Sequence, residues 1–136
     1  MRFLLDTNIC IYIIKNRPSE VLEQFCRYHP SDIAISTVSL FELEYGAEKS
    51  NQRQKALQAL DRFLSPLQVV DLDRVAAAEA AAIRARLEAL GTPIGPYDTL
   101  IAGVARSNGL VLVTNNAREF ARVEGLVVEN WVEQSK

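Results

Sequence analysis

Short apolar runs alternate along the chain with longer segments in which apolar residues recur every three or four positions. The short runs are typical of β-strands, and the longer spacing is typical of amphipathic helices. Strands are predicted over residues 3–5, 33–36, 67–70, 110–113 and 127–129. Helical spacing covers residues 9–15, 21–26, 40–46, 51–63, 74–90, 99–107 and 118–121. This alternation predicts a single α/β domain over residues 1–136, with a central, mostly parallel sheet and helices on both faces.

Polar residues at the predicted helix starts are candidate N-caps, because their side chains can accept a hydrogen bond from a free backbone N–H of the first turn. The predicted caps are Thr7 or Asn8, Ser19, Thr37 or Ser39, and Asp73. Asp73 precedes the longest helix, which is rich in alanine and ends before Gly91.

Composition narrows the class of protein. The chain has 136 residues, 49% of them hydrophobic, and a net charge of −2, so its charge does not mark it as a general nucleic-acid binder. No apolar stretch approaches the roughly 20 residues of a membrane span. The N-terminus lacks the pattern of a secretory signal, so we expect a cytoplasmic protein. Cys10 and Cys26 lack metal-site spacing, so we expect two reduced core residues.

The chain has one histidine, His29, which precedes a proline. A catalytic triad needs a histidine held by an orienting acid, and a histidine-rich zinc site needs several histidines. One histidine beside a proline in a connecting segment meets neither need. Acid–base or metal chemistry must therefore come from carboxylates.

Three carboxylates stand in apolar surroundings. Asp6 ends the first predicted strand, Glu42 lies within an apolar helical turn, and Asp98 begins a helix that soon becomes apolar. A buried ionised carboxylate is costly without compensation. Each residue also has a plain structural explanation. Asp6 can cap a helix, and Asp98 can be a cap or a first-turn acid favoured by the helix dipole. Glu42 can extend its carboxylate to solvent or pair with a lysine or arginine.

Grouped carboxylates suit a divalent cation. Like charges repel and raise each other's pKa unless a cation lies between them. Mg²⁺ and Mn²⁺ prefer oxygen ligands and are commonly held by one or two carboxylates. Such a cation can activate water and stabilise the charge that develops on a phosphodiester.

Four segments together carry a resemblance over nearly the whole chain. The chain resembles PIN-domain ribonucleases of the VapC toxin type, whose fold is a three-layer sandwich around a parallel sheet. The matching segments are Leu5-Asp6-Thr7-Asn8, Ser39-Leu40-Phe41-Glu42-Leu43 with Tyr45-Gly46-Ala47, residues 95–102, and residues 113–120.

The resemblance implies the toxin of a type II toxin–antitoxin pair. It would be a Mg²⁺-dependent endoribonuclease, with Mn²⁺ as the alternative ion, inhibited by a cognate antitoxin. The expected substrate is tRNA, with initiator tRNA as the leading choice. A homodimer is also expected, using faces of the helix 74–90 and of the helix after Asp98.

Residue by residue, the resemblance makes Asp6, Glu42 and Asp98 the catalytic acids, with Asp6 and Asp98 as the principal metal ligands. The chain departs from the family pattern at Asn116, where many PIN domains have an aspartate. Glu119 is three residues further on and can restore that charge, or it can be a surface acid that pairs with Arg122. Residues expected to orient the acids or the attacking water are Thr7, Thr114 and Asn115.

Four basic residues are candidate RNA contacts: Lys15, Arg17, Lys49 and Arg118. Each can equally be a solvated surface charge.

The sequence is also compatible with two other functions. Aspartyl-phosphate phosphatases also begin with a strand that ends in aspartate, but they need a second acid two residues later, where this chain has Asn8. The other is an interaction module in which the acids have only structural roles. Metal binding that depends on Asp98 would separate the nuclease from such a module.

Overall fold

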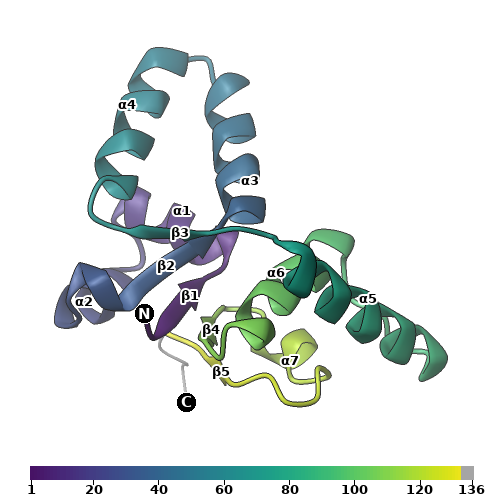
Figure 1. Ribbon diagram of the computed structural model, residues 1–136. Helices are drawn as coiled ribbons and strands as arrows, with labels where there is room; N and C mark the ends of the chain where they lie inside the picture. The colour runs from purple at the N-terminus through teal and green to yellow at the C-terminus, as the bar shows by residue number, and fades with distance from the viewer. Residues whose placement is uncertain (133–136) are drawn as a thin grey trace.

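The computed structural model describes residues 1–132 and confirms the predicted α/β architecture. A parallel sheet lies at the centre and helices cover both of its faces (Figure 1). The strands are β1 (Phe3–Leu5), β2 (Ile33–Ser36), β3 (Gln68–Val70), β4 (Val111–Val113) and β5 (Val128–Glu129). The helices are α1 (Thr7–Lys15), α2 (Ser19–Arg27), α3 (Thr37–Glu48), α4 (Arg53–Leu64), α5 (Arg74–Ala89), α6 (Pro96–Ser107) and α7 (Ala117–Phe120), with a 3₁₀ turn at Pro30–Asp32.

The strand order β3-β2-β1-β4-β5 places β1 in the middle of the sheet. Every described strand pair is parallel, and Leu5 is in register with Ile35 on one side and Val113 on the other. Because parallel strands end at the same edge, the residues after β1 and β4 emerge together there. Ligands bind beyond this carboxyl edge in open α/β sheets.

Side chains that alternate along the strands divide the core in two, as the period of two in a strand requires. Leu4, Ala34 and Leu112 face α5, α6 and α7. Phe3, Leu5 and neighbouring strand residues face α1, α2 and α4. Every residue of β1 is fully buried, so Asp6 follows a strand that is covered on both faces.

Helix α6 is held close to α5 by a glycine. A Cβ added at Gly103 would lie 2.7 Å from the Ala76 carbonyl oxygen and 2.7 Å from the Ala80 Cβ. Both distances are too short for a real contact, so only glycine allows this approach of the two helices. Since Asp98 lies in the first turn of α6, the packing helps to set the position of that acid.

Helices α3 and α4 form an antiparallel pair that extends away from the sheet (Figure 1). The pair leaves one side of α3 next to α1 and the opposite side towards α6. Helix α3 therefore borders both the carboxyl edge of the sheet and the space between α1 and α4.

Several predicted details were wrong. The first helix is capped by Asp6, which confirms the structural alternative for that residue over Thr7 and Asn8; the second follows Pro18 with Ser19 as its first residue, and the third is capped by Ser36. In each case the cap is the residue directly before the first helical one, one to three positions before the predicted cap. The prediction of Asp73 as a cap is confirmed, because its carboxylate accepts from the Ala76 amide.

Both cysteines are free, but only Cys10 is in the core, and Cys26 is exposed on α2. Among residues 1–132, no helix is both long enough and apolar enough to cross a bilayer.

Candidate active site at the carboxyl edge of the sheet

Asp6 follows the central strand and begins α1. Its Oδ1 accepts a hydrogen bond from the Ile9 amide at 2.9 Å, so the residue does cap the helix. The side chain is only 4% exposed. The pKa of Asp6 is raised from 3.8 to about 6, mainly by burial and to a smaller extent by the charges of Asp98 and Glu42, while hydrogen bonds from the Thr114 side chain and the Ile9 amide act against the rise. Helix capping therefore explains where Asp6 lies, but it does not explain why other acidic side chains lie near it.

Asp98 lies on α6, near Asp6 at the carboxyl edge of the sheet. It lies in the first turn of that helix and is half-buried. Burial raises its pKa, and the nearby charges of Glu119 and Glu42 add to the effect. The mutual influence of these side chains shows that four acids from separate segments, Asp6, Glu42, Asp98 and Glu119, share one region of the molecule.

Glu42 is held by a hydroxyl from α1. The Thr7 hydroxyl donates to Glu42 Oε1 at 2.7 Å, and it also lies 3.0 Å from the Ser39 hydroxyl. Glu42 is thus bonded to the residue that directly follows Asp6. The contact joins α1 to α3 across a separation of 35 residues in the sequence.

Asn116 and Glu119 interact with each other at the start of α7. The Asn116 side-chain amide donates to Glu119 Oε2 at 2.9 Å, and the Asn116 backbone N–H donates to the Thr114 hydroxyl at 2.8 Å. A neutral amide thereby orients a carboxylate that influences Asp98. Glu119 does not bond Arg122 here: the Arg122 guanidinium donates to the Pro93 carbonyl.

The donor set suits a hard divalent cation held loosely. Within residues 1–132, no group of three or more Asp, Glu, His or Cys side chains is arranged closely enough to hold a metal ion as it stands. Mg²⁺ does not need one, since it keeps several waters and is usually held by one or two carboxylates. Burial is the main cause of the raised pKa values of Asp6 and Asp98, and the neighbouring acids add a smaller repulsion, which a cation would relieve.

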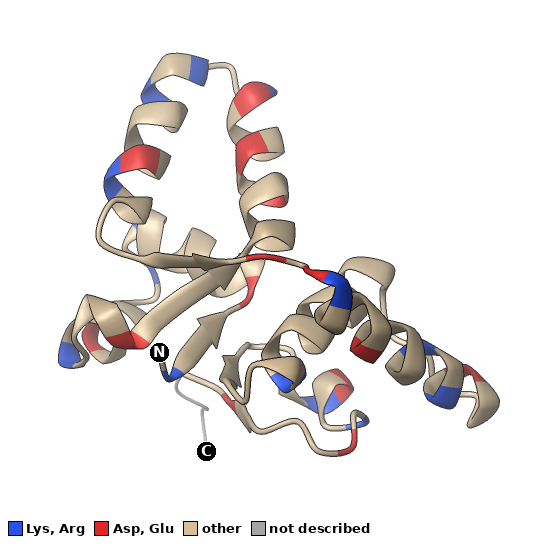
Figure 2. Ribbon diagram, in the orientation of Figure 1, with Lys and Arg blue, Asp and Glu red and all other residues tan. Residues whose placement is uncertain are grey.

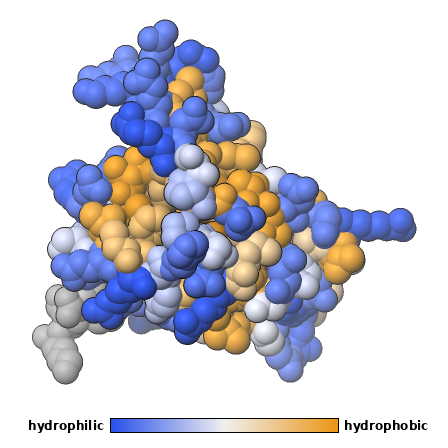
Figure 3. Space-filling model, turned by 60° about the vertical axis from the view of Figure 1, so that its left-hand side comes forward, coloured by the Kyte–Doolittle hydropathy of each residue, from blue (hydrophilic) through white to orange (hydrophobic). Residues whose placement is uncertain are grey.

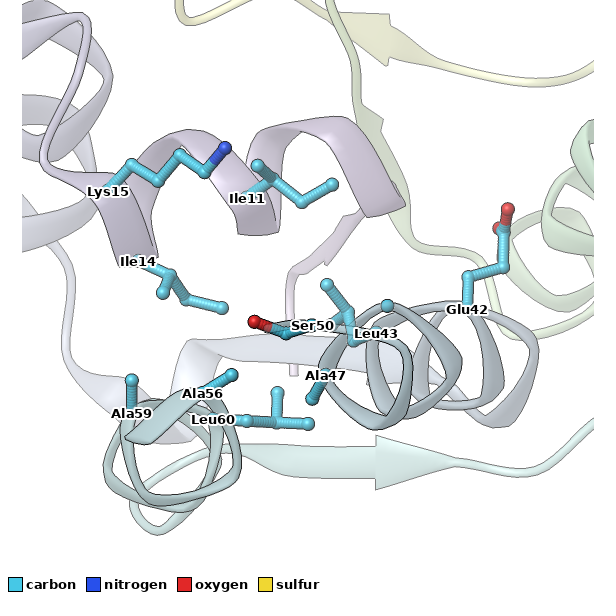
Figure 4. A pocket seen from close by; sticks show the side chains of 11 residues that line it. Ile11, Ile14, Lys15, Glu42, Leu43, Ala47, Ser50, Ala56, Ala59 and Leu60 are labelled. Atoms are coloured by element: carbon cyan, nitrogen blue, oxygen red, sulfur yellow. The ribbon is translucent and has the colours of Figure 1, made fainter. Parts of the chain in front are cut away.

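The predicted basic residues lie at different distances from the acids. Lys15 and Glu42 line the same groove, from α1 and α3, and lie at opposite sides of it (Figure 4). Lys49 follows Glu42 by seven residues, about 10 Å along the helix axis, and its ammonium lies over the Tyr45 ring. Arg17 and Arg118 are exposed, after α1 and on α7. Figure 2 shows acidic residues along α3, and charges of both signs on α4, α5 and α7.

A mainly apolar groove of about 330 Å³ lies beside the acidic region. It is formed by α1, α3 and α4, and Glu42 stands at its edge with the carboxylate directed away from the apolar side chains (Figure 4). The apolar lining is Ile11, Ile14, Leu43, Ala47, Ala56, Ala59 and Leu60. In the space-filling view, apolar residues gather in the body of the molecule, below the largely hydrophilic end of the projecting helices (Figure 3).

Two features near the acids escaped the sequence analysis. Ser36 and Ser39 are fully buried, and their hydroxyls lie between the end of β2 and Thr7. The sequence had suggested only that Ser36 ends a strand and that Ser39 is a candidate cap. Phe41 and Tyr97 form an edge-on aromatic pair between α3 and α6, with 55% and 47% of their surface exposed. Each directly precedes one of the acids in the sequence, which was the available signal.

Comparison with known proteins identifies the family. The PIN domain family matches residues 3–126. The chain belongs to the PIN-domain family.

Within that family, the chain is similar to VapC proteins along nearly its full length. It is 50% identical over 131 residues to the tRNA(fMet)-specific endonuclease VapC of Shigella flexneri, which covers 96% of this chain and 98% of the relative. It is 44% identical over 132 residues to ribonuclease VapC2 of Haemophilus influenzae, covering 97% and 99%. The Salmonella typhimurium VapBC structure bound to DNA has a chain that matches with a TM-score of 0.91 and 48% identity, covering 97% of this chain and 99% of that one.

Proposed function

We propose that this PIN domain is the ribonuclease toxin of a type II toxin–antitoxin pair. The observation that carries the proposal is the meeting of Asp6, Glu42 and Asp98 at one sheet edge, in a chain that is 50% identical to a tRNA(fMet)-specific endonuclease. The proposed substrate is tRNA, with initiator tRNA as the leading choice. A cytoplasmic location follows from that substrate.

In the proposed mechanism, Asp6 and Asp98 hold Mg²⁺, or Mn²⁺ as the alternative, and Glu42 completes the site. The cation, when bound, supplies the positive charge that a phosphodiester needs and lowers the pKa of water. The chain itself orients the acids: the Ile9 amide fixes Asp6, and the Thr7 hydroxyl fixes Glu42. Asn116 holds Glu119 near Asp98, where the extra negative charge compensates in part for the missing aspartate.

The phosphatase alternative has no support from the site. Asn8 is exposed on α1 and carries no proton at neutral pH that it could give to a leaving group. The acids that surround Asp6 come instead from α3 and α6.

The test uses purified protein with initiator tRNA and elongator methionine tRNA as substrates. Asp98→Asn should lose cleavage and the metal dependence of cleavage, and EDTA should stop the wild-type reaction. Asp61→Asn, which changes an exposed acid on α4, is the matched control and should cleave normally. Full cleavage by folded Asp98→Asn would contradict the proposal, and equal cleavage of both tRNAs would contradict the choice of initiator tRNA.

The proposed antitoxin covers the acids and the neighbouring apolar groove. The groove offers apolar surface next to a negatively charged region, so an apolar segment with an arginine directed at the carboxylates is complementary to both. Ala56→Glu would place a charge in the groove without changing the acids. It should leave cleavage intact while the co-expressed antitoxin no longer relieves toxicity; unchanged relief would place the antitoxin elsewhere.

We also propose a homodimer through the faces of α5 and α6. Val75 on α5 is 63% exposed and Leu90 after it is 59% exposed, which leaves apolar surface for a second copy. Light scattering should give twice the monomer mass, and Val75→Asp should lower it. A monomeric wild-type protein would contradict this assignment.

A further inference from the structure

A row of three hydroxyl groups runs from the buried end of β2 to Glu42. The Ser36 and Ser39 hydroxyls are 3.4 Å apart, the Ser39 and Thr7 hydroxyls are 3.0 Å apart, and the Thr7 hydroxyl is 2.7 Å from Glu42 Oε1. Ser36 and Ser39 are fully buried. The row therefore connects the core of the protein to one oxygen of a candidate catalytic acid.

The direction of these hydrogen bonds follows from the number of protons. Each hydroxyl has one proton to donate, and an ionised carboxylate can only accept. Thr7 gives its proton to Glu42, so its contact with Ser39 must be one in which Ser39 donates. Ser39 has then used its own proton and must accept from Ser36. All three hydroxyls thus point towards Glu42.

The backbone holds the buried end of the row. The Ser39 amide donates to the Ser36 hydroxyl oxygen at 3.0 Å, which is the capping bond of α3. Ser36 therefore has a structural task of its own. Ser39 has no such task through its hydroxyl, because the capping bond uses its amide.

We propose that Ser39 is a positioning residue for Glu42, acting through Thr7. This inference rests on the proposed nuclease function. By fixing the Thr7 proton on Oε1, Ser39 would keep the second oxygen of Glu42 available to a cation. A carboxylate held at one oxygen loses less rotational freedom when it meets a cation, so the row favours metal binding and correct placement of RNA at the acids.

The test compares metal affinity and kinetics in Ser39→Ala and Thr7→Val. Both should bind Mn²⁺ about 10- to 100-fold more weakly in calorimetry, the usual effect of removing a group that orients a ligand. Both should lower kcat with little change in the KM for RNA. Thr7→Ser keeps the hydroxyl and should restore Mn²⁺ affinity. The matched control is Ser107→Ala, which removes a hydroxyl that bonds only at the end of α6, to the Val104 carbonyl and the Asn108 side chain.

The double variant tests the route of the effect. If Ser39 acts through Thr7, Ser39→Ala combined with Thr7→Val should bind Mn²⁺ no more weakly than Thr7→Val alone. Additive losses would overturn the route, and normal Mn²⁺ affinity of folded Ser39→Ala would overturn the proposal. If Ser39→Ala does not fold, Ser39→Cys keeps the volume with a much weaker donor and should show the same loss.

Failure of this inference is distinguishable from failure of the proposed function. Cleavage lost in Asp98→Asn but normal in Ser39→Ala would leave the nuclease assignment standing and remove the role of Ser39. Cleavage retained in Asp98→Asn would remove the nuclease assignment, whatever Ser39→Ala does.

Discussion

Asp6 and Asp73 have the same local role in very different surroundings. Each caps a helix, and each accepts from the backbone amide three residues later at 2.9 Å. Asp73 is exposed at the start of α5, whereas Asp6 is buried at the centre of the sheet edge with Asp98 and Glu42 near it. A helix cap requires neither burial nor neighbouring acids, so the surroundings of Asp6 point to a second role.

The largest expected difference between the two aspartates is in RNA cleavage. Asp6→Asn keeps a capping oxygen but removes the charge, and it should reduce kcat/KM by at least about a hundredfold, as removal of one electrostatic group from an active site does. Asp73→Asn makes the same chemical change at an exposed cap and should cleave at the wild-type rate. Equal activity of the two variants would remove the distinction drawn here.

The next difference is in the pH dependence of stability without metal. The pKa of Asp6 is raised from 3.8 to about 6 in the folded state, so folding holds a proton that the unfolded chain releases. This favours the folded state below about pH 4, and the advantage is lost as the pH rises through about 6. The full loss corresponds to about 3 kcal/mol in the free energy of unfolding.

Urea unfolding in EDTA at pH 4 and pH 8 measures this effect. Asp6→Asn cannot ionise, so relative to wild type it should gain stability between the two pH values, by up to about 3 kcal/mol. Asp73→Asn should follow the wild-type curve. If the free energies of unfolding of wild type and Asp6→Asn differed by the same amount at both pH values, ionisation of the buried Asp6 would not destabilise the fold.

The smallest expected effect concerns the cap alone. Asp73→Ala removes the acceptor for the Ala76 amide and should lower the free energy of unfolding by about 1 kcal/mol, with no change in cleavage. Thermal or urea unfolding at pH 7 measures the loss, and Asp73→Asn, which retains an acceptor, is the control. If Asp73→Ala also cleaved RNA more slowly, the start of α5 would influence the acidic site, and the effect would not be limited to helix stability.

Much of the fold was predictable because strands and helices leave different periods in the sequence. The five predicted strands and the alternation with helices are confirmed, and boundaries differ by one to three residues at most ends. Caps were harder to predict, since several polar residues are adjacent at each helix start. Ser36, Thr37 and Ser39 all suit the cap of α3, and only the backbone conformation selects Ser36.

The candidate acids were predictable as types but not as a group. Asp6, Glu42 and Asp98 each stood out as a charge within an apolar segment, and their resemblance to the PIN pattern joined them. The sequence left two interpretations of Glu119: a surface acid that pairs with Arg122, or an additional acid beside the other three. The contact of Asn116 with Glu119, and the influence of Glu119 on Asp98, favour the second interpretation.

The sequence by itself determined the strands, the helices, the parallel sheet and the family, because periodicity and short motifs are local properties of the chain. Only the tertiary structure decided that Thr7 bonds Glu42, that Ser39 contacts Thr7 from the buried side, and that Asp6 lies within reach of the charges of Glu42 and Asp98. These contacts join residues that are 32 to 92 positions apart. Their distances depend on sheet register and helix packing, which no local pattern encodes.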